Sequence, residues 1–426
     1  MTASLECAAV TAADPLHRTV DAVWRIESPK LIAGLTRIVR DVGIAEDLAQ
    51  DALVAALQQW PKDGVPDNPA AWLMATAKHR AIDLIRRHAL FERKQEELAL
   101  DVERRLETPD PVEALDDQIG DDLLRLIFIS CHPILSTEAR VALTLRLLGG
   151  LTTDEIARAF LVPEATVAQR IVRAKRTLAE ARVPFEVPRG KELEARLASV
   201  LEVVYLIFNE GYSATTGDDW TRPALCDDAL RLGRVLAELA PHEPEVHGLV
   251  ALMEIQASRL RARTSPTGAA IPLLEQDRGR WDYMLIERGL AAIARAESLG
   301  QKPGPYLLQA SIAACHARAR IADQTDWNRI ASLYDTLAQV TPSPIVELNR
   351  AVAIAMARGP AAGLEIADAL QSEPSLENYH LLPAVRADFL GKLGRHDEAR
   401  AEFERAASLT RNARERDLLL ERARKL

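Results

Sequence analysis

Apolar residues recur every three or four positions through most of the chain, which is the period of an amphipathic helix. In the N-terminal part, this pattern predicts a pair of helices within 14–40, divided at Ser28-Pro29, and then helices over 43–60 and 69–87. The loop between the last two begins at Pro61, which should end the preceding helix. Asn68 can cap the next helix, with Pro69 at its first position.

The two helices over 43–60 and 69–87 differ in the charge of their outer faces. The first has a predicted inward stripe and a predicted outer face: Ala49, Leu53, Ala56, Leu57 and Trp60 inside; Glu46, Asp47, Gln50, Asp51 and Gln58 outside. The second is predicted to bury four apolar residues and to be strongly cationic: Leu73, Ala77, Ala81 and Leu84 inside; Lys78, Arg80, Arg86 and Arg87 outside. An acidic surface alone indicates only solubility.

Residues 152–178 have the pattern of two short helices joined by a tight turn. Thr152 and Glu155 are spaced to form a capping box, and Pro163 is a favourable start for the second helix. That helix has a narrow apolar seam and a polar opposite face: Val167, Ile171, Ala174 and Leu178 on the seam; Thr166, Gln169, Arg170, Arg173 and Arg176 opposite. Arg and Gln pair well with base edges and phosphates in a major groove. The stretch predicts a helix-turn-helix, with an ordinary basic surface helix as the alternative.

Helical patterns continue to the end of the chain with short breaks, over 191–211, 223–240, 243–263, 281–300, 305–323, 327–340, 344–358, 360–371 and 376–426. Near the end, Ala387, Ala399 and Ala406 are small residues at helix-packing positions of a tetratricopeptide-like unit. Ala351 and Gly363 indicate a weaker second copy. Aromatic residues make up only 4% of the chain. The predicted fold class is therefore all-α, with a stacked helical-repeat array that offers a concave surface.

The net charge of −9 is unevenly distributed. Residues 96–122 contain eleven acidic and two basic residues, a local balance equal to the whole excess. By contrast, 78–94 carries six basic and two acidic residues, and 164–182 carries five and two. Basic charge concentrated in two segments is compatible with phosphate binding by an acidic protein. Residues 91–120 lack an apolar period and are predicted to be a flexible acidic linker.

The four cysteines are far apart and form no CxxC pair, so we expect reduced, buried thiols and neither disulfides nor zinc. The chain has no signal-peptide pattern and no apolar run near the ~20 residues that span a bilayer. A cytoplasmic protein without a membrane partner is expected.

The segment from Glu46 to Arg87 resembles the second conserved region of sigma-70-family factors of the extracytoplasmic-function (ECF) type. The residues that carry this resemblance match the family's signature: Trp72, Leu73, Ala77, Asp83, Leu84, Arg86 and Arg87. The helix-turn-helix at 152–178 stands where the family has its fourth region. Two motifs in the right order and separation are more specific than either alone. One departure is His79, where many relatives have Asn.

The resemblance implies roles for three sets of residues. Polymerase binding, on the β′ clamp helices, is implied for Asp47, Leu48, Gln50 and Asp51, while the fourth region would contact the β flap. Minus-ten recognition is implied for Asp67, Asn68, Trp72, Lys78, Arg80, Arg86 and Arg87, with the loop 64–68 capturing a flipped base. Minus-thirty-five recognition is implied for Thr166, Gln169, Arg170, Arg173 and Arg176. The expected partners are core RNA polymerase and promoter DNA.

The expected division is a region-2 domain over 1–90, the linker over 91–120, a region-4 domain over 121–185 and a helical extension over 186–426. An ordinary ECF factor would end near 185, and this chain resembles the subgroup that carries a long helical-repeat extension. We expect the extension to control activity, through contact with the sigma domains or with an unknown protein partner. The hypothesis predicts a sigma factor that directs promoter-specific initiation.

Two polar clusters in the extension are not explained by repeat packing: Asn209, Glu210 and Tyr212 beside Asp218 and Asp219; Gln276, Asp277, Arg278, Trp281 and Asp282. No phosphate loop, nucleophile motif or metal-ligand spacing accompanies them, so no catalytic activity, cofactor or metal is expected. The main alternative is a helix-turn-helix regulator with a repeat-type sensor domain that never joins polymerase. An enzyme with an appended DNA-binding domain is the third possibility.

Overall fold

The computed structural model describes residues 3–92, 115–160, 162–213, 221–265, 271–410 and 412–426. These residues form helices, turns and short 3-10 segments, with no β-strand among them. They divide into two compact units, Met1–Val203 and Val204–Leu426. The predicted all-α fold class is confirmed.

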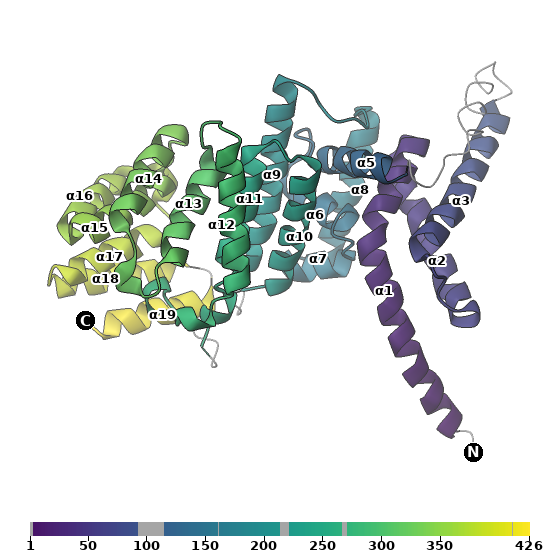
Figure 1. Cartoon of the computed structure of the whole chain (residues 1–426). Helices are drawn as coiled ribbons and strands as arrows, with labels where there is room; N and C mark the ends of the chain where they lie inside the picture. Colours follow the sequence, from purple (N-terminus) through teal and green to yellow (C-terminus); the bar gives the residue numbers. More distant parts are fainter. Residues whose placement is uncertain (1–2, 93–114, 161, 214–220, 266–270, 411) are drawn as a thin grey trace. The chain divides into compact units, whose positions relative to one another are not determined.

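The first three helices of unit 1 pack against one another: α1 (Ala3–Val39), α2 (Val42–Asp63) and α3 (Pro69–Glu92) (Figure 1). The prediction of a helical pair within 14–40 is wrong, because α1 runs through Pro29 without a break. Val20 lies before the proline and Leu31 and Leu35 lie after it, and all three are buried. Packing on both sides therefore offsets the backbone hydrogen bond that the proline removes.

Helix α2 departs from the predicted pattern in three places. It continues past Pro61 to Asp63 and ends at Gly64, whose φ of 85° takes the chain out of the helix. Leu57, predicted to face inward, is 38% exposed. Glu46, predicted to face outward, is buried. The inward face of α2 is therefore rotated from the predicted stripe toward Glu46, and Ala52 and Ala55 are buried on it.

Four further helices complete the central part of unit 1: α5 (Leu115–Ser130), α6 (Thr137–Leu147), α7 (Thr153–Phe160) and α8 (Glu164–Glu180). Residues 93–114 of the predicted linker lie outside the described residues, but 115–120 are helical, as are 91 and 92. The predicted linker therefore extended too far at both ends. The acidic residues at 116 and 117 belong to the first turn of α5, and acidic residues are favourable at a helix N-terminus.

The first half of helix α9 (Lys191–Tyr212) also belongs to unit 1. Arg196 donates to the carbonyl of Phe128 at 3.0 Å, and Ser199 donates to the carbonyl of Cys131 at 2.7 Å. Arg140 donates to Ser199 and pairs with Glu202. This segment satisfies backbone carbonyls at the end of α5 and thereby completes the unit.

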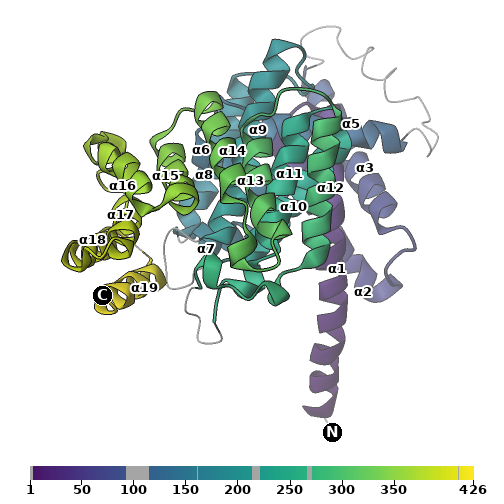
Figure 2. The ribbon, with the colours of Figure 1, turned by 60° about the vertical axis from the view of Figure 1, so that its left-hand side comes forward.

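Unit 2 is a succession of helices: α10 (Pro223–Leu239), α11 (Pro244–Ala257), α12 (Tyr283–Ser298), α13 (Pro305–Arg318), α14 (Trp327–Val340), α15 (Pro344–Arg358), α16 (Pro360–Ala369), α17 (Leu381–Lys392), α18 (His396–Leu409) and α19 (Ala413–Arg424). Short 3-10 segments lie at Leu260–Ala262, Leu273–Glu275, Arg278–Arg280, Ala322–Gln324, Leu370–Ser372 and Pro374–Leu376. From α13 onward each helix packs on the next one in the chain, and both views show this arrangement within the unit (Figures 1 and 2).

The predicted tetratricopeptide-like pairs are α15 with α16 and α17 with α18. Ala351, Ala387, Ala399 and Ala406 are completely buried between these helices. A Cβ on Gly363 would lie 2.7 Å from the carbonyl oxygen of Ala351, so this position requires glycine for the helices to approach. Small residues at the crossings confirm the stacked helix pairs.

The thiols of Cys131 and Cys226 are buried, and burial raises their pKa values to about 11 and about 12. Cys315 is half-buried, with a pKa raised for the same reason. Nothing is described for the side chain of Cys7. Within the described ranges, no helix has the length and apolar character needed to cross a membrane.

Candidate nucleic-acid interface

The helix-turn-helix forms as predicted, and its first helix begins with a reciprocal cap. The amide of Glu155 donates to the Thr152 hydroxyl at 3.1 Å, and the amide of Thr152 donates to the Glu155 carboxylate at 2.8 Å. These bonds satisfy two amides that the start of α7 would otherwise leave unpaired. Helix α8 starts directly after Pro163.

Helix α8 has the predicted division between a buried seam and a polar face. Val167, Ile171, Ala174 and Leu178 are all buried. On the opposite face Gln169, Arg173 and Arg176 are exposed, and Thr166 and Arg170 are half-buried. The Arg176 guanidinium donates to Glu180 at 2.8 Å, one turn further along. The exposed side chains available to a groove are therefore mainly Gln169 and Arg173, with Arg176 held by a carboxylate.

The predicted minus-ten residues lie on α3 and on the loop before it. Asn68 caps α3, accepting from the amide of Ala71 at 3.0 Å. Trp72 packs edge-on against Trp60, with ring centroids 5.5 Å apart, which joins α3 to α2. Asp67, Lys78, Arg86 and Arg87 are exposed. This end of the unit presents three cations from one helix, and Leu84, predicted to be buried, is only half-buried among them.

The predicted polymerase-binding residues divide between surface and core. Asp47 and Asp51 are exposed. Asp51 pairs with Arg80 of α3 at 3.3 Å, so a residue of the polymerase set contacts one of the minus-ten set. Leu48 is only 8% exposed, because it faces the helices packed on α2. We therefore correct its assignment from a surface contact to a core residue.

Glu46 is the residue whose environment the sequence analysis missed. Its side chain is 3% exposed and receives bonds from Arg146 of α6 at 2.6 Å, from Lys175 of α8 and from Gln50 at 2.7 Å. Burial by itself raises its pKa, but the charges of Lys175 and Arg146 outweigh this and lower the pKa below its ordinary value. Glu46 thus links the predicted polymerase-binding helix to the predicted DNA-reading helix.

A second ion pair joins the same two parts of unit 1. Arg25 of α1 donates to Glu155 of α7 at 2.7 Å, and Gly150, with φ of 71°, lies against Arg25 and Ser28. A Cβ on Gly150 would lie 3.4 Å from the Arg25 Cα. The capping carboxylate of the helix-turn-helix therefore has a second role as a contact to α1.

Comparison with known proteins gives three family matches along the chain. Residues 24–91 match sigma-70 region 2, and residues 125–178 match sigma-70 region 4. Residues 196–297 match a family of unknown function (DUF6596). The first two matches cover α2, α3 and the helix-turn-helix, in the order predicted.

Among similar proteins, an uncharacterised protein of Rhizobium meliloti is 43% identical over 393 residues, 91% of each chain. A probable ECF RNA polymerase sigma factor, SigI of Mycobacterium tuberculosis, is 27% identical over 173 residues, 40% of this chain and 58% of its own length. The ECF RNA polymerase sigma factor SigK of a Mycobacterium species is 30% identical over 145 residues, 32% of this chain and 69% of its own. The chain belongs to the ECF family of RNA polymerase sigma factors. The Rhizobium protein shares the extension of this sigma factor as well, since the match covers nearly the full length of both.

In the extension of this ECF sigma factor, the two polar clusters meet through a residue that the sequence analysis did not name. Arg259 donates to the Tyr212 hydroxyl at 2.6 Å, and its guanidinium lies 5.8 Å from the ring centroid of Trp281. Glu210 is engaged with Arg222, and Asn209 is exposed. Asp218 and Asp219 lie outside the described residues. Arg259 lies in the turn between α11 and the 3-10 segment Leu260–Ala262, and no local sequence pattern distinguishes it.

Proposed function

We propose that this sigma factor binds core RNA polymerase and directs it to promoters, with α8 reading the minus-thirty-five element. The observation that carries the proposal is the division of α8, whose apolar seam is buried while Gln169 and Arg173 are exposed. Gln169 and Arg173 can each make two hydrogen bonds to a base edge. Arg170 and Thr166, at the margin of this face, suit phosphate contacts that set the register.

The minus-ten element is read by α3 and the loop at 64–68. Lys78, Arg86 and Arg87 hold backbone phosphates, and Asp67 and Asn68 contact an unpaired base beside Trp72. Exposure of these charged residues supports the assignment. Asp47 and Asp51 bind the β′ clamp helices of polymerase, and the region-4 helices contact the β flap. All of these contacts take place in the cytoplasm.

Helices α3 and α8 cannot read their two promoter elements at the same time while α2 and α8 remain in contact. Elements named minus ten and minus thirty-five lie about 25 base pairs apart, or about 85 Å along B-DNA. Glu46 of α2 and Lys175 of α8 form an ion pair, so this packing has to open on a promoter. The described arrangement of unit 1 is thus a closed state, in which polymerase binding competes with the Glu46 and Arg25 contacts.

The test is run-off transcription from candidate promoters with core RNA polymerase and the full-length protein. Replacing Asp47 and Asp51 together with Asn should lower promoter-dependent transcript by about tenfold or more, because two interfacial charges are lost. Asp63→Asn is the matched control, since Asp63 is an exposed acid on the same helix. Operator binding by the isolated protein, with no transcript and no binding to core polymerase, would instead favour a regulator that never joins polymerase.

The extension controls this activity, and its role is tested by truncation at Val203. Ending the chain near Pro184 would remove Arg196 and Ser199, which bond to the carbonyls of Phe128 and Cys131 in unit 1. A chain ending at Val203 keeps those bonds and removes only unit 2. Identical promoter-dependent transcription by this truncated chain and the full chain would contradict a controlling role for the extension.

A further inference from the structure

Unit 2 buries an arginine that pairs with no carboxylate in the part of the chain that the structure describes. Arg259 is only 8% exposed. Its guanidinium contacts the Tyr212 hydroxyl, the Gln256 side-chain oxygen and the rings of Tyr212 and Trp281, while its Nε has no hydrogen-bond partner. Among the described residues no carboxylate pairs with it. A buried cation is costly unless paired, so an uncompensated one is unusual in a structural core.

A second buried arginine lies on the same tryptophan. Arg278 lies 4.8 Å from the centroid of the Trp281 ring and donates to the carbonyls of His316 and, at 2.7 Å, of Ala319. These carbonyls lie at the end of α13, so Arg278 has a structural role as a helix cap. Among the described residues, however, it pairs with no carboxylate, and Arg259 and Arg278 therefore both place a positive charge against Trp281. Burial, together with Arg259 and Arg278, lowers the pKa of His316 to about 4, as expected in a positive environment.

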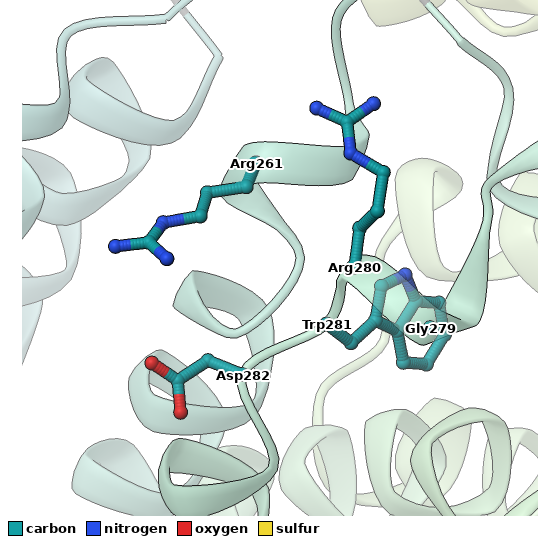
Figure 3. A pocket seen from close by; sticks show the side chains of 5 residues that line it. All are labelled: Arg261, Gly279, Arg280, Trp281 and Asp282. Carbon is teal, nitrogen blue, oxygen red and sulfur yellow. The ribbon is translucent and has the colours of Figure 1, made fainter.

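Trp281 also lines a surface pocket of about 490 Å³, together with Arg261, Gly279, Arg280 and Asp282 (Figure 3). The figure shows the side chains of Arg261 and Arg280 extending in different directions from two separate segments. Both are exposed, and among the described residues neither forms an ion pair. The volume is within the range of small-molecule sites.

The carboxylates nearest to these arginines in the sequence are engaged elsewhere. Asp277 accepts from the amide of Gly279 at 2.9 Å. Asp282 caps α12, accepting from the amides of Met284 at 3.0 Å and Leu285 at 3.2 Å. Each is used as a cap, and neither forms an ion pair with the arginines around Trp281. The pocket itself is lined by two arginines and one carboxylate, and the buried Arg259 and Arg278 contact its Trp281, so positive charge is in excess here.

We propose that this pocket binds a small organic anion carrying two or more negative charges, with Arg261 and Arg280 as its direct ligands. Guanidinium forks match the oxygens of phosphate and carboxylate groups. Two guanidinium ligands on separate segments can each pair with one negative group, so a ligand with two or more negative groups can engage both. Arg259 and Arg278, fixed behind Trp281, supply a positive field that costs no reorganisation when the ligand arrives. The ligand would give the extension a chemical signal to sense.

The experiment is calorimetric titration of the full-length protein with inorganic pyrophosphate and, separately, with citrate at constant ionic strength. Saturable binding of pyrophosphate alone would identify a phosphate site, and binding of citrate alone a carboxylate site. Arg261→Gln and Arg280→Gln should each weaken binding by about tenfold, and the double variant should abolish it. Both residues are exposed, so these variants keep the fold. Arg295→Gln, an exposed arginine on α12 outside the pocket, is the control and should bind normally.

Two results would overturn the proposal. One is the lack of saturable binding of either probe at millimolar concentration. The other is an equal loss of binding in Arg295→Gln and in the pocket variants, which would mean that the anions respond only to the overall charge of the protein. Because this readout uses neither polymerase nor DNA, its failure would leave the proposed sigma function untouched.

Discussion

Replacing Glu46 with Gln tests whether the contact between α2 and α8 holds unit 1 closed. The substitution keeps the shape of the side chain and removes the charge that Arg146 and Lys175 share. Removing one partner of a buried ion pair costs about 3–5 kcal/mol. Arg146 and Lys175 are 21% and 19% exposed and can regain some water, so we expect a loss of about 2 kcal/mol. Because the partners lie on α6 and α8, the loss affects the packing between helices rather than α2 itself.

Two assays follow from this magnitude. Amide hydrogen exchange in α6 and α8 should accelerate by up to about 30-fold, at 1.4 kcal/mol per factor of ten. Affinity for core polymerase should rise by up to the same factor, because less free energy is spent on opening. Glu27→Gln is the matched control, since its one ion pair among the described residues is with Lys30 on its own helix. Unchanged exchange and unchanged polymerase affinity in Glu46→Gln would refute the reasoning.

The same contact should depend on pH with a defined sign. The pKa of Glu46 in the folded protein is lowered from 4.5, so its contribution is fully present above pH 4.5. It is lost as the pH falls below 4.5 and through the folded pKa, where Glu46 becomes protonated. Expressed relative to the intrinsic exchange rate at each pH, the protection of the α8 amides against hydrogen exchange should therefore fall below pH 4.5 more strongly in the natural protein than in Glu46→Gln. Parallel pH profiles would contradict the assignment.

Two further predictions concern the recognition helix and the extension. Arg173→Ala should weaken binding of a minus-thirty-five duplex by about tenfold, measured by fluorescence anisotropy at fixed salt. Arg176→Ala should weaken binding less, because Glu180 already holds the Arg176 guanidinium. Equal effects of the two substitutions would refute this distinction. Gly248→Ala should lower the free energy of unfolding of the extension by about 1–3 kcal/mol, measured by urea unfolding. The reason is that the new Cβ would lie 2.6 Å from the Leu307 amide nitrogen. Gly279→Ala is the control and should lower the free energy of unfolding less, because Gly279 is exposed and the atom nearest to its new Cβ is a side-chain oxygen.

Much of the helix-turn-helix could be predicted from the sequence because its interactions are local. The capping box joins Thr152 to Glu155, and the seam of α8 repeats every three or four residues, so both are visible in a short window. The bounds of α14 and α15 were also predicted to the residue. The order of the two sigma regions came from the resemblance, and the family matches at 24–91 and 125–178 confirm it.

The errors occurred where partners distant in the sequence change the environment of a residue. Pro29 would break an isolated helix, but the core around Leu31 and Leu35 keeps α1 continuous. The resemblance placed Leu48 in the polymerase-binding set with Asp47 and Asp51, which are exposed, whereas the side chain of Leu48 is buried. Periodicity predicts which residues share a helix face, but not how many sides of that helix are covered by others.

The sequence by itself determined the helical class, the caps and the two sigma-region motifs, since each depends on residues within one or two turns of each other. Only the tertiary structure decided that Glu46 is buried, because Arg146 lies 100 residues away from it along the chain. It likewise decided that Arg259 joins Tyr212 to Trp281, which no spacing along the chain reveals. Burial and charge pairing are properties of neighbours in space, and in a chain of stacked helices those neighbours come from distant segments.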